Sequence, residues 1–276
     1  MSADPRMPRR CVLYRAVRIG SGLTLASWFR AEPAAAAPAI PSPAEQKAVG
    51  AQASEDVLRK YQQVADGRLR FFRQLAGRLV ASLSEADRTA WDYKFYVLAS
   101  KEVNAFALPG GPVFMLTGLY AQMKTQDALA AVTAHELAHV YRQHWAKAYA
   151  KQLQRRRVVA IGTLLAGNKG AALGWGAVIA SALRQRYSRE EEDEADALGL
   201  KDMVAAGYNP QGMIQLFETL QKAGGEGGGP LGGPFLADHP LTSDRIQRTK
   251  DRIAQMGPRT FPPLRPLNYD ALLRQS

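Results

Sequence analysis

The sequence predicts an α+β fold that is mainly helical and carries a small antiparallel sheet. Apolar residues recur at helical spacing through several long segments, which indicates amphipathic helices. Three short runs near residues 95–98, 103–108 and 113–116 are rich in β-forming residues and follow one another closely along the chain. With 46% hydrophobic residues in 276 positions, the chain can bury a core, which excludes wholesale disorder.

Residues 1–37 are expected to be an export signal. They combine a basic start, an uncharged and mostly apolar stretch from Ile19 to Phe29, and small residues of the Ala-x-Ala type at 34–37. These are the three parts of a secretory signal, and the apolar part is shorter than the about 20 residues that span a bilayer. The alternative is a disordered basic tail. The export interpretation places the protein in the periplasm.

The net charge and the cysteine content of the chain are different when residues 1–37 are left out. The chain has 36 basic and 25 acidic residues, a formal charge of +11, and residues 1–37 account for four units of it, which leaves +7. This remainder favours at most peripheral contact with an acidic membrane surface. Because no aromatic–basic platform or known module accompanies it, we expect no nucleic acid partner. The single cysteine, Cys11, lies in the same segment, which excludes an intramolecular disulfide and a cysteine-built zinc site.

The elements of the remaining chain can be placed in order. Residues 38–53 are rich in Pro and Ala and are expected to be a linker, so that the folded domain spans 54–276. Ser54 can cap a helix that runs to Leu83, and Thr125 can cap a second that runs to Ala150. The apolar stretch 158–183 predicts a helical hairpin packed on the domain, with a membrane-touching hairpin as the alternative. Further helices are expected over 189–206, 210–223 and 243–256, and a mobile loop over the glycine-rich 224–233.

One segment of the second long helix predicts a metal site. His135 and His139 are four residues apart, slightly more than one helical turn, so their imidazoles share a face and can reach one zinc ion. Glu136 stands beside them, where a carboxylate can accept a proton from water. The alternative is a helix with two surface histidines and an unrelated glutamate. The composition makes such a chance match rare.

A catalytic zinc ion takes a third protein ligand and keeps one position open. His144 and His239 are the remaining histidines, and a carboxylate is the other choice. Glu192 and Asp196 are again one helical turn apart, so Glu192 could bind the metal while Asp196 accepts the N–H of a metal-bound imidazole. His144 is expected to support a ligand or to lie in the core. Read alone, the acidic run around Glu192 would be a solvated helix face.

Several segments between residues 104 and 245 together resemble one enzyme family. They are Asn104–Gly111, Gly118-Leu119, the His135–His139 segment with Arg142 and His144, Ser188-Arg189 with Glu192–Asp196, and His239-Pro240 with Arg245-Ile246. On these motifs the chain resembles the exported bacterial branch of the M48 (Ste24/HtpX-like) family of gluzincin metallopeptidases. The resemblance implies one Zn2+ per chain, held by His135, His139 and Glu192, with Glu136 as general base. It also implies that the edge strand of the sheet borders the active-site cleft.

The same resemblance suggests roles for the other motifs. His239 and Arg245 are expected to contact the oxyanion or the substrate. As alternatives, His239 caps the open metal position and keeps the enzyme latent, or His239-Pro240 simply forms a turn before a helix, and Arg245 forms a surface ion pair. The edge strand could bind an extended peptide through its backbone, even where its side chains pack in the core. The residues of this strand are Asn104, Ala105, Phe106 and Ala107.

Backbone pairing of this kind favours unfolded or misassembled proteins over one particular sequence. We therefore expect a zinc endopeptidase of envelope quality control, with outer-membrane assembly machinery as a possible partner. The alternative is a binding or chaperone-like module of the periplasm that keeps the fold while its metal site is latent.

Overall fold

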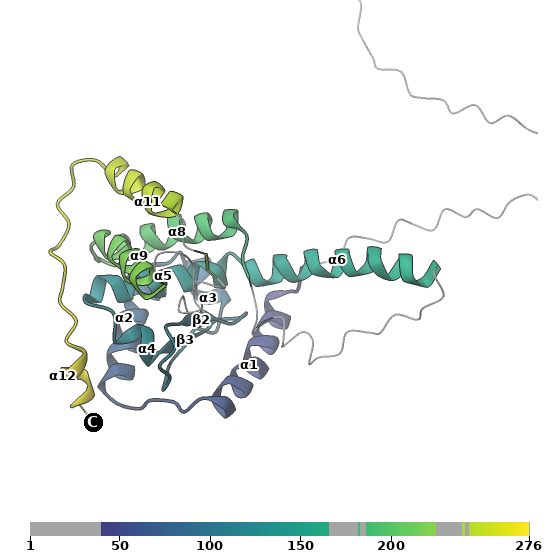
Figure 1. The fold of residues 1–276 in the computed structure, drawn as a ribbon, viewed down its shortest axis with the longest axis horizontal. Helices are drawn as coiled ribbons and strands as arrows, with labels where there is room; N and C mark the ends of the chain where they lie inside the picture. Colours follow the sequence, from purple (N-terminus) through teal and green to yellow (C-terminus); the bar gives the residue numbers. More distant parts are fainter. Residues whose placement is uncertain (1–39, 166–181, 183–185, 225–238, 241–242, 276) are drawn as a thin grey trace, which may run out of the picture. The chain divides into compact units, whose positions relative to one another are not determined.

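The computed structural model describes residues 40–165, 182, 186–224, 239–240 and 243–275 (Figure 1). The export signal expected at 1–37, residues 166–181 and 183 of the expected hairpin and residues 225–233 of the expected loop lie outside these ranges. Within the described ranges, no helix combines the length and the apolar character needed to cross a membrane.

Three strands form one mixed sheet in the order β1-β3-β2. β1 (Lys94–Leu98), β2 (Ala105–Ala107) and β3 (Pro112–Leu116) lie where the sequence predicts strands. β2 pairs antiparallel with β3, but β1 pairs parallel with it, so the expectation of a wholly antiparallel sheet is wrong. The reason is that β3, which is buried along its whole length, takes the place between the two strands that precede it. β2 is thereby left as an edge strand.

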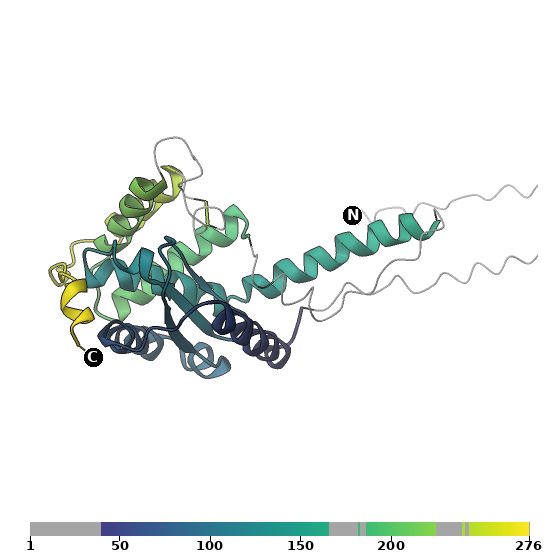
Figure 2. The same cartoon turned by 60° about the horizontal axis from the view of Figure 1, so that its bottom comes forward.

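Alternate residues of β3 face two different hydrophobic layers, as strand geometry requires. Val113 and Met115 belong to the larger core, which they share with α5 (Gln126–Tyr141). Phe114 packs into a second cluster with α1 (Pro43–Lys60). Figure 2 shows α1 on one side of the sheet and the green helices on the other. The sheet is therefore supported from both faces.

The first helix begins earlier than the sequence predicts. α1 starts at Pro43, inside the expected linker over 38–53, because Ser42 forms a capping box with Glu45. Its first turns pack on the domain through buried residues that include Gln46 and Val49. The linker expectation is therefore wrong from Pro43 onward.

The predicted single helix from Ser54 to Leu83 is also wrong. α1 ends at Lys60, and α2 (Gly67–Ser82) follows as a separate helix. Residues 62–64 leave the helical path because they pair with the outer edge of β1, where the Val64 N–H donates to the Val97 carbonyl at 2.8 Å. This pairing covers part of the second edge of the sheet.

A sharp break divides the second long helix. α5 ends at Tyr141, and α6 (His144–Leu165) starts after only two residues. Gln143 has φ 57°, a left-handed conformation that ends an α-helix. The predicted uninterrupted helix to Ala150 is wrong at this point. The break allows His144 to contact α5, as described below.

The C-terminal helices occupy the segments that the sequence predicts. They are α8 (Arg189–Ala205), α9 (Gln211–Gly224) and α11 (Ser243–Gln255). Three short helices are not predicted, namely α3 (Glu85–Ala90), α4 (Thr117–Tyr120) and α12 (Tyr269–Leu273). α8 approaches α5 so closely that a Cβ on Gly199 would lie 2.9 Å from the backbone nitrogen of His135. This contact brings the acidic helix against the histidine helix.

Candidate metal centre

Four buried side chains from separate parts of the chain converge at one point. They are His135 and His139 of α5, Glu192 in the first turn of α8, and His239. One ligand atom of each lies within 4.8 Å of the others. The two Nε2 atoms of His135 and His139 are 3.0 Å apart, and His239 Nδ1 lies 2.8 Å from Glu192 Oε1. The structure brings together the three residues that the sequence suggests as ligands and adds His239.

The charges around this cluster suit a divalent cation. The carboxylates of Glu136, Glu192 and Asp196 are each at most 2% exposed, and Arg245 is a buried cation that pairs with two of them. Burial would lower the pKa of His239, but Glu192 and Glu136 raise it to about 9, which reflects excess negative charge. Buried charge is unfavourable unless it is balanced. Zinc would supply that balance, and imidazole nitrogens with a carboxylate oxygen are donors that it binds.

Asp196 holds the imidazole of His135. Its Oδ1 lies 3.0 Å from His135 Nδ1, which leaves Nε2 facing the cluster. Burial would raise the pKa of Asp196, but the Arg245 guanidinium, 2.7 Å away, holds it at about 2. Arg245 also lies 2.7 Å from Glu192 Oε2. From the sequence, Arg245 could contact the oxyanion or substrate or form a surface ion pair. The structure shows a buried ion pair of Arg245 with Glu192 and Asp196.

A separate chain of contacts holds His139. Its Nδ1 lies 2.8 Å from His144 Nδ1, His144 Nε2 lies 3.1 Å from Glu194, and Glu194 accepts from Arg142 at 2.6 Å. Because an ionised carboxylate only accepts, His144 Nε2 carries the proton and its Nδ1 accepts from His139. Burial lowers the pKa of both histidines, which favours their neutral forms. The Nε2 lone pair of His139 therefore faces the cluster.

Glu136 lies between the cluster and the edge strand. Its carboxylate accepts a hydrogen bond from the backbone N–H of Ala107 in β2. Glu136 Oε1 has no hydrogen-bond partner among the described residues and lies 3.6 Å from His239 Nε2. Burial raises the pKa of Glu136, while His239 and His135 act in the opposite direction. A buried carboxylate with a raised pKa and one oxygen that accepts no hydrogen bond among the described residues is suited to accepting a proton.

Tyr187 contributes a wall that the sequence analysis does not single out. Its ring stacks on His139, with the ring centroids 3.9 Å apart and the planes inclined by 18°. The residue directly precedes Ser188, the N-cap of α8. That position beside the acidic motif is the only signal that could have indicated it, since an isolated tyrosine is as readily a core residue.

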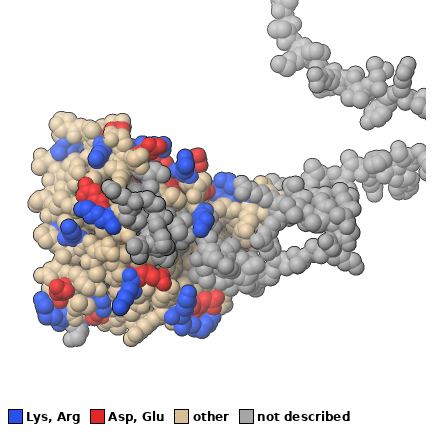
Figure 3. Space-filling model, in the orientation of Figure 1, with Lys and Arg blue, Asp and Glu red and all other residues tan. Residues whose placement is uncertain are grey.

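The basic residues are in part engaged in ion pairs. On the face shown in Figure 3, basic and acidic side chains stand beside one another instead of gathering into one basic field. Asp193, for example, pairs with Arg248 at 3.1 Å and with Arg252 at 2.7 Å. The net positive charge is thus distributed among mixed charges on this face.

The fold and the histidine–glutamate centre define the class of the protein as a metallopeptidase-type domain. The sequence profile described as Peptidase family M48 matches residues 72–253. The chain therefore belongs to peptidase family M48.

Three metallopeptidases are similar in sequence to part of this chain. The "Beta-barrel assembly-enhancing protease" of Escherichia coli (strain K12) is 28% identical over 196 residues, which cover 68% of this chain and 39% of that relative. The "Mitochondrial metalloendopeptidase OMA1" of Schizosaccharomyces pombe is 33% identical over 162 residues, 58% of this chain and 46% of the relative. The "Metalloprotease YcaL" of Escherichia coli (strain K12) is 29% identical over 218 residues, 77% of this chain and 82% of the relative. The chain spans about 40% of the length of the beta-barrel assembly-enhancing proteases that it matches.

Proposed function

We propose that the protein is a zinc-dependent endopeptidase that hydrolyses peptide bonds of unfolded or misassembled envelope proteins. The observation that carries this proposal is the Oε1 of Glu136, which accepts no hydrogen bond among the described residues and lies beside the convergence of His135, His139 and Glu192. A proton acceptor next to a set of nitrogen and oxygen donors is the arrangement that hydrolysis by activated water requires.

In this proposal, His135, His139 and Glu192 would hold one zinc ion. Bound zinc would lower the pKa of a water molecule towards about 7 and polarise the peptide carbonyl. Glu136 accepts the proton of the attacking water and passes it to the amine that leaves. Asp196 and His144 keep the two imidazoles in the tautomers that present Nε2.

The edge strand β2 is the proposed support for the substrate backbone. The Leu116 N–H donates to the Asn104 backbone carbonyl at 3.0 Å, and the Leu108 N–H donates to the Pro112 carbonyl at 2.8 Å. Because antiparallel pairing alternates, residues 105 and 107 turn their backbone groups away from β3. The Ala107 N–H already donates to Glu136, so an extended peptide would pair with that side of the strand through the backbone groups of Ala105 and the Ala107 carbonyl.

His239 supports a second candidate function. It lies inside the donor cluster, so it can either contact a reaction oxyanion or occupy the position that a substrate would need. In the second case the protein would be a latent, chaperone-like module of the periplasm. Arg245 acts in both cases by holding Glu192 and Asp196 in place.

The cellular setting is proposed from the first 37 residues and from the relatives. A basic, apolar and small-residue order is typical of export and supports a periplasmic location, and the charge of +7 on the rest of the chain supports peripheral contact with an acidic membrane surface. The name of the beta-barrel assembly-enhancing relatives suggests unfolded outer-membrane proteins, or the machinery that assembles them, as partners.

The test compares Glu136→Gln with Glu218→Gln, an exposed glutamate on α9 that serves as the matched control. The zinc-loaded proteins are incubated with unfolded casein, and zinc content is measured in parallel. We expect Glu136→Gln to bind zinc but to cleave about 10²–10⁴-fold more slowly, and the control to match the unaltered protein. Cleavage by Glu136→Gln at the unaltered rate would refute the mechanism. Protection of casein from aggregation without cleavage by either protein would favour the latent module.

A further inference from the structure

One hydrogen bond on its own does not fix the plane of the His139 imidazole. The Nδ1–H of His139 donates to His144 Nδ1 at 2.8 Å. A single bond of this kind permits the ring to turn about the line that joins the two nitrogens. The rotamer does not fix the plane either, because χ2 of histidine is a broad torsion. Turning the ring would point the Nε2 lone pair away from the cluster, so a further contact is needed to hold it.

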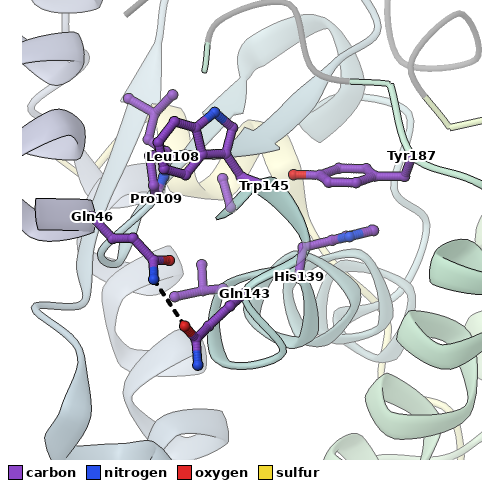
Figure 4. Close-up of a pocket in the computed structure, with 9 residues that line it drawn as sticks. Gln46, Leu108, Pro109, His139, Gln143, Trp145 and Tyr187 are labelled. Carbon is purple, nitrogen blue, oxygen red and sulfur yellow. Dashed lines mark hydrogen bonds between the residues drawn. The ribbon is translucent and has the colours of Figure 1, made fainter. Parts of the chain in front are cut away.

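The ring of Tyr187 provides this contact. It lies parallel to the His139 ring, with the centroids 3.9 Å apart and the planes inclined by 18°. Centroids of most aromatic pairs are about 4.5–7 Å apart, so these two rings are in close face-to-face contact. Figure 4 shows the Tyr187 ring over the His139 ring, which it reaches from a segment outside α5. A flat ring against one face prevents the imidazole from turning, and His139 Nε2 stays 3.0 Å from His135 Nε2.

Tyr187 is also joined to the turn that carries Glu192. It directly precedes Ser188, the N-cap of α8, and the Ser188 carbonyl accepts from the Glu192 N–H at 2.9 Å. The stack therefore connects the last turn of α5 with the first turn of α8, and each of these turns carries one proposed ligand. The Tyr187 ring lies farther from His239, with the centroids 5.5 Å apart and the planes inclined by 42°. Its parallel contact is with His139.

We infer that Tyr187 is a positioning residue of the metal centre, whose ring fixes the plane of His139 and the spacing between His139 and Glu192. The inference rests on the proposed zinc site and adds to it a residue that acts through His139. The contact is made by the face of the ring, so an aromatic ring is required at this position. Tyr187 is half-buried, and the fold can therefore accept a change of this side chain.

The test compares a variant that loses the ring with one that keeps it. Tyr187→Leu retains an apolar side chain without a ring, and Tyr187→Phe retains the ring. Tyr96→Leu is the matched control, because Tyr96 is a half-buried tyrosine that stacks on Phe114 with the centroids 4.8 Å apart, in the hydrophobic cluster shared with α1. Zinc affinity is measured by competition with a chelating dye, and stability by urea unfolding.

We expect zinc affinity to fall about 10–100-fold in Tyr187→Leu, as for other groups that orient a ligand. Tyr187→Phe and Tyr96→Leu should keep the affinity of the unaltered protein, although Tyr96→Leu should be less stable. Loading with Co2+ in place of zinc gives a visible absorption spectrum that reports the coordination geometry. This spectrum should change in Tyr187→Leu and remain the same in Tyr187→Phe.

The outcomes separate this inference from the proposed function. Zinc binding by Tyr187→Leu with unaltered affinity and an unaltered Co2+ spectrum, or an equal loss in Tyr187→Phe, would overturn the role of the ring and leave the zinc enzyme standing. If Tyr187→Leu does not fold, an NMR contact between the ring protons of Tyr187 and His139 in the zinc-loaded protein decides. Its presence supports the inference, and its absence overturns it. Failure of the unaltered protein to bind zinc would overturn the proposed function and this inference together.

Discussion

Gly199 controls how closely the acidic helix approaches the histidine helix. A Cβ at this position would lie 2.9 Å from His135 N, 3.1 Å from Ala134 C and 3.2 Å from His135 Cα. Ordinary contacts between heavy atoms lie at about 3.5–4.0 Å. Because the obstructing atoms are backbone, Gly199→Ala must push α8 away from α5 by roughly 0.5 Å.

The displacement acts on the metal centre and on stability at once. Gly199 lies one turn beyond Asp196 and two turns beyond Glu192 on the same helix, so both acids move away from the histidines. Metal sites tolerate errors of about 0.2 Å in ligand distances, and we expect zinc affinity to fall about tenfold or more. Overpacking costs about 1–3 kcal/mol, while alanine in a helix gains about 1 kcal/mol over glycine. The net loss of unfolding free energy is therefore up to about 2 kcal/mol.

Gly77 provides the matched control. It lies on the exposed face of α2, where an added Cβ would meet no atom within 4 Å among the described residues. Gly77→Ala should raise the free energy of unfolding by about 0.5–1 kcal/mol and leave zinc affinity unchanged. Urea unfolding and competition with a chelating dye measure the two quantities. A Gly199→Ala protein with unaltered zinc affinity and increased stability would refute the reasoning.

Three further predictions concern two buried polar contacts and the proposed metal. His144→Ala should weaken zinc binding by about 10–100-fold, because His139 loses the acceptor that fixes its tautomer; dye competition showing unaltered affinity would contradict this. Asp127→Ala should lower the free energy of unfolding in urea by about 2–4 kcal/mol. The reason is that buried Asp127 accepts hydrogen bonds from the backbone N–H groups of Asn209 and Arg265 at 2.8 Å each. An unchanged midpoint of urea unfolding would contradict this prediction. Chelation of zinc should lower Tm reversibly, because a ligand at a free concentration of 1,000 times its Kd adds about 4 kcal/mol of stability. A Tm that does not respond to added zinc would contradict a metal at this site.

The part of the site that depends on one helical period could be predicted from the sequence. His135 and His139 share a face because they are four residues apart, and the same holds for Glu192 and Asp196. The structure places these two faces against each other, with Asp196 on His135. The positions of the strands and of the C-terminal helices could also be predicted, because local periodicity and helix caps indicate them.

The remainder depends on where helices end and which elements meet. The helix-favouring pattern continues through Gln143, so periodicity carries no sign of the break that brings His144 onto His139. Residues five apart on an unbroken helix do not face each other. Gln46 lies 97 residues before its partner Gln143, in a stretch whose Pro and Ala content suggests a linker. Only the packing of α1 on the domain brings these two side chains together.

The C-terminal side of the centre is held together by one guanidinium. Arg245 contacts Glu192 and Asp196, and it also donates to the Pro240 carbonyl at 3.0 Å, directly after His239. The same side chain therefore links a proposed metal ligand, the acid that orients His135, and the segment that carries the fourth member of the cluster. Because Arg245 lies in the first turn of α11, the docking of this helix is coupled to the geometry of the whole centre. A change that shifts α11 would alter the positions of His239 and Glu192 together, even though no residue of the helix besides Arg245 needs to touch either of them.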